Sequence, residues 1–137
     1  MKITISTAKK HEVIDITDKV SELVKKSKVK NGICNVFARH STAAVIINEN
    51  YDPNICVDLL NALNKVFPDQ AGYLHDRVDG NAGAHIKAAF LGPSETVPFE
   101  NGRLKLGRWQ SIMLVELDGP RNEREIEVQI ISDEKQR

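Results

Sequence analysis

Segments with the alternating pattern of β-strands lie at both ends of this chain, and segments with helical spacing lie between them. Alternation of apolar with polar residues predicts strands over residues 2–6, 11–17 and 125–131, and residues 109–117 are expected to form a further, long strand. Helical spacing predicts a helix that begins at Asp52-Pro53 and ends before Pro68. Because the strands do not alternate one by one with helices, the order favours an α+β fold. In such a fold, two to three helices pack on antiparallel or mixed β-sheet layers.

The centre of the chain carries further local signals. Apolar runs over 33–38 and 43–47 predict two buried strands, and a short helix is expected over about 83–91. Asn101-Gly102 is the clearest hairpin signal, because both central residues of such a turn need positive φ. A chain of 137 residues with these elements is expected to form a single domain, over residues 1–137.

Composition excludes several classes of partner. Lysine plus arginine and aspartate plus glutamate both number 19, and aromatic residues make up 5% of the chain, so a nucleic-acid partner is not predicted. The longest unbroken apolar run, Ala43 to Ile47, is too short to cross a bilayer, and the first residues lack the apolar run of a signal peptide. Cys34 and Cys56 fit no metal-binding spacing. The short apolar run predicts no membrane partner. Free thiols suit a reducing compartment, so we expect a cytoplasmic location.

Three of the four histidines lie where elements are expected to end or begin. His40 ends a buried strand, His75 lies in a polar loop, and His85 lies in the first turns of the short helix. Neutral imidazole is a common metal ligand, and three such ligands with an open position make a catalytic zinc site. Their spacing matches no local metal motif, so each is also explained as a hydrogen-bonded structural residue. His11 is expected to be an ordinary exposed residue.

Polar residues near the predicted turns are candidates for binding an anion. Asn81 follows Gly80 at an expected helix N-terminus, where free amides attract phosphate, although helix capping also explains it. Arg121 follows an Asp-Gly-Pro turn and can clamp an anion in a fork, or be solvated. Asn48-Glu49-Asn50 comes directly after an apolar strand, where loops often hold function but where such residues also simply form turns.

Three groups of segments match a known family when they are taken together and in order. The segments are His40-Ser41-Thr42-Ala43-Ala44 with Ile47-Asn48-Glu49-Asn50 and Asp52-Pro53, then His75 with Gly80-Asn81 and Ala84-His85-Ile86-Lys87, and finally Leu106-Gly107 with Trp109-Gln110 and Asp118-Gly119-Pro120-Arg121. In this arrangement the chain resembles the YjbQ family, called secondary thiamine-phosphate synthase. The resemblance covers most of the chain from His40 onward.

The resemblance implies a small α+β subunit of a homotrimer, a metal site formed by histidines, and a weak thiamine-phosphate synthase activity. The matching metal ligands are His40, His75 and His85. Three imidazoles suit Zn²⁺, while diphosphate chemistry usually uses Mg²⁺. The implied catalytic residues are His85, Glu49 and Arg121. The residues implied to bind a small phosphorylated or anionic substrate are Ser41, Asn48, Asn81, Gln110 and Arg121.

The sequence departs from the family's pattern at two positions that bear on function. Gly83 stands where many members carry aspartate, and Arg108 stands where a small residue is usual. Glycine has no side chain to ligate a metal or act as a base, so any role of that acid is in doubt here. Two hypotheses remain open. The chain is a metal-binding enzyme that stabilises a leaving pyrophosphate, or it is a non-catalytic trimeric module that binds metal and a small anionic metabolite.

Overall fold

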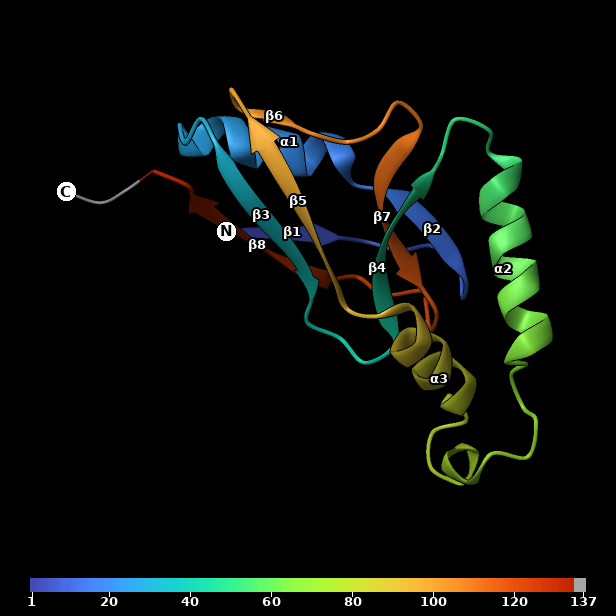
Figure 1. Ribbon diagram of the computed structural model, residues 1–137. Coiled ribbons are helices and arrows are strands. Elements are labelled where there is room, and N and C mark those ends of the chain that lie inside the picture. Colours follow the sequence, from blue (N-terminus) through green and yellow to red (C-terminus); the bar gives the residue numbers. More distant parts are fainter. Residues whose placement is uncertain (135–137) are drawn as a thin grey trace.

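Eight strands form two antiparallel sheets in the computed structural model, which describes residues 1–134 (Figure 1). In spatial order, the larger sheet contains β1 (Lys2–Ile5), β8 (Arg124–Ser132), β3 (Gly32–Ala38), β5 (Ser94–Glu100) and β6 (Arg103–Leu104). The smaller sheet contains β2 (Glu12–Asp15), β7 (Gln110–Glu116) and β4 (Ala43–Glu49). The predicted α+β fold with antiparallel sheet layers is therefore confirmed.

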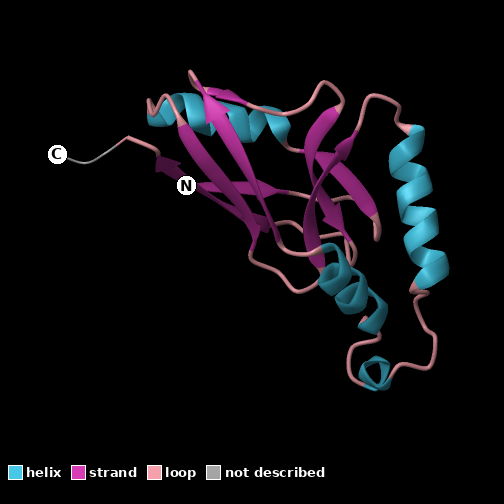
Figure 2. Ribbon diagram, viewed as in Figure 1, coloured by secondary structure: helices cyan, strands magenta, loops and turns pink. Residues whose placement is uncertain are grey.

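Three α-helices and one short 3₁₀ helix complete the described fold (Figure 2). They are α1 (Thr17–Ser27), α2 (Asn54–Val66), η1 (Leu74–Arg77) and α3 (Ala82–Leu91). The main core lies between the two sheets, and Val20 and Val24 of α1 are completely buried in it. A second cluster lies on the other face of the small sheet, where Ala84 and Ala88 of α3 pack with Val115 and, from α2, the partly buried Leu60. None of the helices over residues 1–134 is both long and apolar enough to span a membrane.

The local signals in the sequence locate most elements, but they do not give the strand partners. The helix expected after Asp52-Pro53 is α2, and the short helix expected over 83–91 is α3. The Asn101-Gly102 turn joins β5 to β6, and both residues have positive φ (53° and 73°). The first two strands are not paired with each other. Instead β1 pairs with β8 and β2 with β7, so the chain crosses from one sheet to the other between them.

A buried ion pair joins the two sheets. Glu116 at the end of β7 is completely buried, and Arg124 at the start of β8 is 3% exposed. Arg124 Nε donates to both carboxylate oxygens of Glu116 (3.0 and 3.1 Å), and its Nη2 donates to Thr42 Oγ1 (3.0 Å). Thr7 Oγ1 donates to Glu116 Oε1 (2.7 Å), and the backbone amides of Leu117 and Asp118 donate to Glu116 Oε2. The pair therefore ties together the segments that follow β1, precede β4, end β7 and begin β8.

A second buried charge belongs to Lys87 of α3. Lys87 is completely buried, and its Nζ donates to Asp69 Oδ1 (3.1 Å). The other oxygen of Asp69 lies 3.2 Å from His11 Nε2 and 3.4 Å from Lys10 Nζ. The expectation that His11 is an ordinary exposed residue is therefore wrong, because its side chain is only 20% exposed and lies against Asp69. A Cβ at Gly83 would lie 2.5 Å from Asp69 Oδ1, so only glycine fits at position 83 while Asp69 stays in place.

We predict that Gly83→Ala destabilises the protein, although alanine normally stabilises a helix interior by about 1 kcal/mol relative to glycine. The new methyl group must displace Asp69, which weakens the ion pair of the buried Lys87. Complete loss of a buried ion's partner costs about 3–5 kcal/mol, which is more than the gain in helix propensity. Urea unfolding at pH 7 measures the change. In a background where Asp69→Ala and Lys87→Met remove both charges, Gly83→Ala should become neutral or stabilising. Equal effects in the two backgrounds would contradict the close contact.

We also predict that Glu116 contributes to stability in a pH-dependent way. Burial raises the pKa of Glu116, but hydrogen bonds from Arg124 and Thr7 outweigh it and lower the pKa below its usual value. A depressed carboxyl pKa stabilises the fold above the unfolded value of about 4.3 and loses this contribution as the pH falls below it. Glu116→Gln should therefore lower the free energy of unfolding most above that pH, and the loss should become smaller as the solution becomes acidic. Urea titrations from pH 3 to 7 measure this, with the exposed Glu123→Gln as control. A cost independent of pH would refute it.

Candidate functional site

Five of the residues singled out in the sequence line one pocket of about 390 Å³, formed where β4 begins and α3 begins. They are His40, Ser41, Asn81, His85 and Arg121. The rest of the lining is Arg39, Thr42, Asp79 and Arg124. Three arginines and one acidic residue line the pocket, and each arginine is also paired with a carboxylate, Arg39 with Glu125 and Glu127, Arg121 with Asp118, and Arg124 with Glu116. The N–H groups that these pairs leave over suit an anion.

His40 uses one ring nitrogen within the protein itself. The backbone amide of Glu125 in β8 donates to His40 Nε2 at 2.7 Å. Burial and the charge of Arg124 lower the pKa of His40, so its neutral form is favoured. A neutral imidazole has one N–H and one lone pair. Since the lone pair on Nε2 accepts from Glu125, the proton lies on Nδ1.

Asp118 orients two further polar residues of the pocket, Asn81 and Arg121. Its Oδ2 accepts from Asn81 Nδ2 (3.0 Å) and from Arg121 Nη2 (2.9 Å), and its backbone oxygen accepts from Arg121 Nε (2.9 Å). Asn81 does not cap α3 through its side chain. Instead Asp76 Oδ1 accepts from the amide of Ala82 (2.9 Å), so this first amide of α3 is not free for phosphate as expected. Asn81 Oδ1 is buried and has no hydrogen-bond partner within residues 1–134, which leaves one acceptor for a bound molecule.

His75 and His85 lie side by side. Their ring centroids are 4.9 Å apart and their planes are nearly perpendicular (88°). Among the described residues neither ring forms a hydrogen bond, and His75 Nε2 lies 3.9 Å from Asp79 Oδ2. His85 also borders two mainly apolar depressions. One, of about 460 Å³, includes Leu74 and Ile86, and the other, of about 330 Å³, includes Ala88 and Pro93. The site therefore offers a cationic end next to apolar walls.

The three histidines expected to bind a metal differ in whether their ring nitrogens are free. Over residues 1–134, no three His, Cys, Asp or Glu side chains gather as a group that could hold a metal ion. His75 and His85 are adjacent, and over residues 1–134 neither ring forms a hydrogen bond, so their nitrogens are left for a ligand. His40 lines the same pocket as His85, but its ring is fixed by Glu125.

Asn48, Glu49 and Gln110 lie at the far end of β4 and β7. β4 starts at Ala43 beside the pocket and ends at Glu49, six residues further along, which spans about 20 Å in a strand. Glu49 pairs with Gln110, whose Oε1 accepts from the amide of Gly107 (2.8 Å). Within one chain these three residues therefore do not lie in the pocket with His85 and Arg121.

The unusual Arg108 has a structural role at this distant end. Its guanidinium carbon lies 4.9 Å from the ring centroid of Trp109, and Trp109 contacts Tyr51 edge-on (4.8 Å between centroids). Arg108 therefore stacks on an exposed aromatic pair, an arrangement that is stabilised by the cation–π attraction.

Arg124 is one of the pocket residues that the sequence interpretation missed, together with Arg39 and Asp79. A signal was present, because Arg124 precedes Ile126 and Val128 with period two, which places a charged residue on the buried face of a strand. A buried charge requires a partner. Its partner Glu116 is the last residue of the preceding strand, β7, and is buried after an apolar run.

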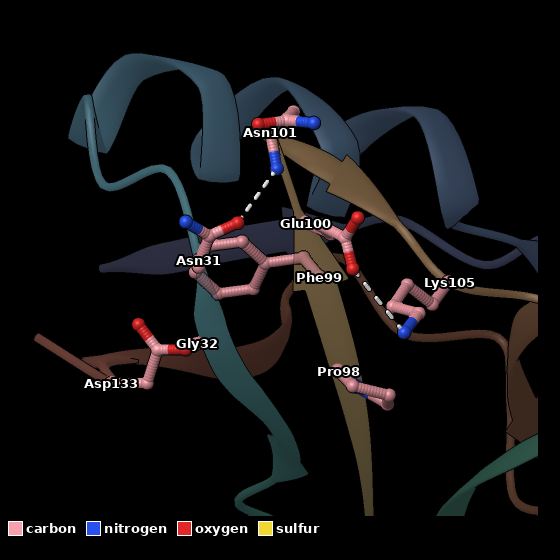
Figure 3. Close-up of a pocket in the computed structure, with 8 residues that line it drawn as sticks. All are labelled: Asn31, Gly32, Pro98, Phe99, Glu100, Asn101, Lys105 and Asp133. Carbon is pink, nitrogen blue, oxygen red and sulfur yellow. Dashed lines mark hydrogen bonds and ion pairs between the residues drawn. The ribbon is translucent and has the colours of Figure 1, made fainter.

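Another, larger depression lies away from all these residues, at the end of the five-stranded sheet (Figure 3). It measures about 520 Å³ and is lined by Asn31, Gly32, Pro98, Phe99, Glu100, Asn101, Lys105 and Asp133. Lys105 is paired with Glu100 (3.5 Å), and the Asn31 side chain accepts from the Asn101 amide (3.0 Å). Its polar groups mainly satisfy one another at a turn, so we do not assign a functional site there.

Comparison with known proteins agrees with the motifs. A family model described as UPF0047 protein YjbQ-like matches residues 1–133. A UPF0047 protein of Methanothermobacter thermautotrophicus is 46% identical over 123 residues, which cover 90% of this chain and 85% of the relative. The UPF0047 protein YugU of Bacillus subtilis is 40% identical and covers 87% of this chain and 89% of its own length.

Solved structures show the same fold. A YbjQ-like protein from Sulfolobus solfataricus, described as of unknown function, superposes with a TM-score of 0.94 at 44% identity, covering 97% of this chain and 96% of that protein. A YjbQ/UPF0047 protein from Clostridium acetobutylicum superposes with a TM-score of 0.91 at 45% identity, covering 96% and 99%. This chain therefore belongs to the YjbQ-like UPF0047 family.

Proposed function

We propose that this protein is a small metal-binding enzyme that acts on a small phosphorylated molecule bound in the pocket at His40 and His85. The observation that carries the proposal is the convergence of the guanidinium groups of Arg39, Arg121 and Arg124 on one pocket, where each keeps N–H groups that its carboxylate partner does not use. The apolar depressions beside His85 suit the organic part of such a substrate, and the arginine side suits its phosphate.

His75 and His85 are the residues of this chain that would hold a divalent metal. Imidazole ligands favour Zn²⁺ over Mg²⁺, which prefers oxygen ligands. When bound, the metal would act as a Lewis acid that stabilises negative charge on a phosphoryl or leaving oxygen. Arg121, held by Asp118, would position the phosphate by donating from its remaining N–H groups. Asn81 Oδ1 would accept a hydrogen bond from the substrate.

Two reactions and one non-catalytic role fit this site. Thiamine-phosphate synthesis is the reaction implied by the family resemblance, and hydrolysis of a phosphate ester is the alternative that suits zinc. The non-catalytic alternative is a trimeric module that binds metal and an anionic metabolite. Assays of the purified protein with thiazole phosphate plus pyrimidine diphosphate, and with a panel of phosphate esters, separate these cases. Activity that persists in His85→Ala would come from a contaminating enzyme. A protein that binds anions without turnover would favour the module.

We further propose a homotrimer, as the resemblance implies. Apolar side chains on the outer surface of the helices support association, since Val57 and Val66 on α2 and Phe90 on α3 are 56%, 67% and 72% exposed. Assembly also bears on Glu49. Because Glu49 lies about 20 Å from the pocket of its own chain, a catalytic role for it requires a pocket of another subunit.

The zinc proposal predicts a specific pattern of thermal shifts. Zinc bound only to the native state raises its melting temperature, so added Zn²⁺ should raise the midpoint of the wild type at pH 7.5. The rise should disappear in His75→Ala and in His85→Ala. His11→Ala is the matched control, because His11 contacts Asp69 and lines none of these pockets. It should change the starting midpoint but keep the zinc-dependent rise. An equal rise in His85→Ala would exclude this metal site.

The trimer proposal predicts the mass in solution. Light scattering at micromolar concentration should give three times the chain mass of 15.3 kDa. A charged residue in an apolar interface weakens association because its desolvation is not compensated. If α2 lies in the interface, Val66→Glu should shift the mass towards the monomer. Asn61→Asp, at an exposed polar position of the same helix, is the control and should not. A monomeric wild type would contradict the proposal.

A further inference from the structure

We infer that His40 is not a metal ligand in this protein but a neutral hydrogen-bond donor, which together with Arg124 forms a preformed binding site for a phosphate or diphosphate group. The inference rests on the proposed function, since it assigns parts of the anion pocket to separate residues. It departs from the arrangement implied by the family resemblance, in which His40 joins His75 and His85 around one metal ion.

The contact with Glu125 carries the assignment of His40. Metal binding needs a free lone pair on imidazole, and neutral imidazole has only one. At 2.7 Å, the Glu125 amide is close enough to occupy the lone pair on Nε2. The neighbouring backbone supports this position, because the Glu125 carbonyl accepts from the Arg39 amide (3.2 Å). Both backbone groups of Glu125 are thus satisfied by consecutive residues, and freeing Nε2 for a metal would leave the amide unpaired.

Nδ1 of His40 is then the nitrogen that carries hydrogen. It forms no hydrogen bond to the described residues, and His40 lines the pocket. The N–H can therefore donate to an oxygen of a bound anion. Neighbouring side chains fit this role, since Arg39, Arg121 and Arg124 line the same pocket and offer further N–H donors to an anion.

Arg124 supplies the fixed positive charge. Its Nε and Nη2 are held by Glu116 and Thr42, while Nη1 has no hydrogen bond within residues 1–134. The side chain is almost completely buried and yet lines the pocket. Its position is therefore set before any ligand arrives, so little side-chain entropy is lost when an anion binds. A guanidinium donor beside an imidazole N–H matches two oxygens of one tetrahedral phosphate.

The tautomer of His40 tests the first half of the inference directly. Two-bond ¹H–¹⁵N spectra distinguish an Nδ1–H imidazole from an Nε2–H imidazole. His40 should show the Nδ1–H form, and its signals should not move on addition of Zn²⁺, whereas those of His75 and His85 should. An Nε2–H form of His40, or a zinc-dependent shift like that of His85, would overturn the inference.

Variants test the second half, with inorganic phosphate, pyrophosphate and Zn²⁺ as calorimetric probes. His40→Gln places an amide oxygen near the Nε2 position and so keeps an acceptor for Glu125, but it removes the Nδ1 donor. Arg124→Lys keeps the charge but removes the guanidinium fork. Each should weaken pyrophosphate binding by about tenfold or more, as loss of a charge-assisted hydrogen bond does, and leave Zn²⁺ affinity unchanged. His75→Ala should do the reverse, and Arg103→Lys on β6, outside the pocket, should change neither.

The outcomes separate the inference from the proposed function. If the wild type binds pyrophosphate and both His40→Gln and Arg124→Lys bind it equally well, the inference is wrong and the proposed function stands. If His40→Gln loses Zn²⁺ as fully as His75→Ala does, His40 is a ligand and the inference is wrong. If the wild type binds neither anion, the proposed function fails, and with it the anion-binding role, while the spectra alone decide whether His40 is a metal ligand. Should Arg124→Lys fail to fold, as judged by circular dichroism, His40→Gln decides.

Discussion

Glu116 and Arg124 form an ion pair buried where the two sheets meet, and both the fold and the pocket depend on it. Neither charge can remain in the interior alone, because an unpaired buried ion costs several kcal/mol. The pair brings the end of β7 to the start of β8, and its hydrogen bonds reach Thr7 and Thr42 on two further segments. Thr42 follows His40 and Ser41, so the same bonds set where the pocket begins. One side of the guanidinium stabilises the fold, and the other faces the site.

Local sequence patterns were enough to predict the class of fold. The helix after Asp52-Pro53 and the turn at Asn101-Gly102 follow from the conformational preferences of those residues, and the structure has them where expected. The partners of the first two strands did not follow, because pairing is decided by contacts over a hundred residues apart, such as Ile3 with Ile126. The contact of His11 with Asp69 joins residues that lie 58 positions apart, and no spacing in the sequence indicates it.

The candidate site was predictable in part for a similar reason. Four residues of the family signatures line one pocket, although they come from separate segments of the chain. They are His40, Asn81, His85 and Arg121. Glu49 does not join them within the chain, and this could have been foreseen. It follows the same predicted strand that His40 precedes, and an extended strand keeps its two ends apart. The amide that fixes His40 belongs to Glu125, 85 residues further along the chain, so the state of that ring became visible only in three dimensions.

Gly83 has a consequence for how this protein can change through evolution. Its missing side chain leaves room for Asp69, and Asp69 in turn neutralises the buried Lys87. Lys87 is stable in the interior only while Asp69 neutralises it, and Asp69 keeps its position only while residue 83 has no side chain. A lineage that acquires a side chain at position 83 must therefore also alter position 69 or 87, or pass through an unstable intermediate. Among homologous sequences these three positions should covary as a unit, and an aspartate at position 83 should accompany a different partner for the lysine.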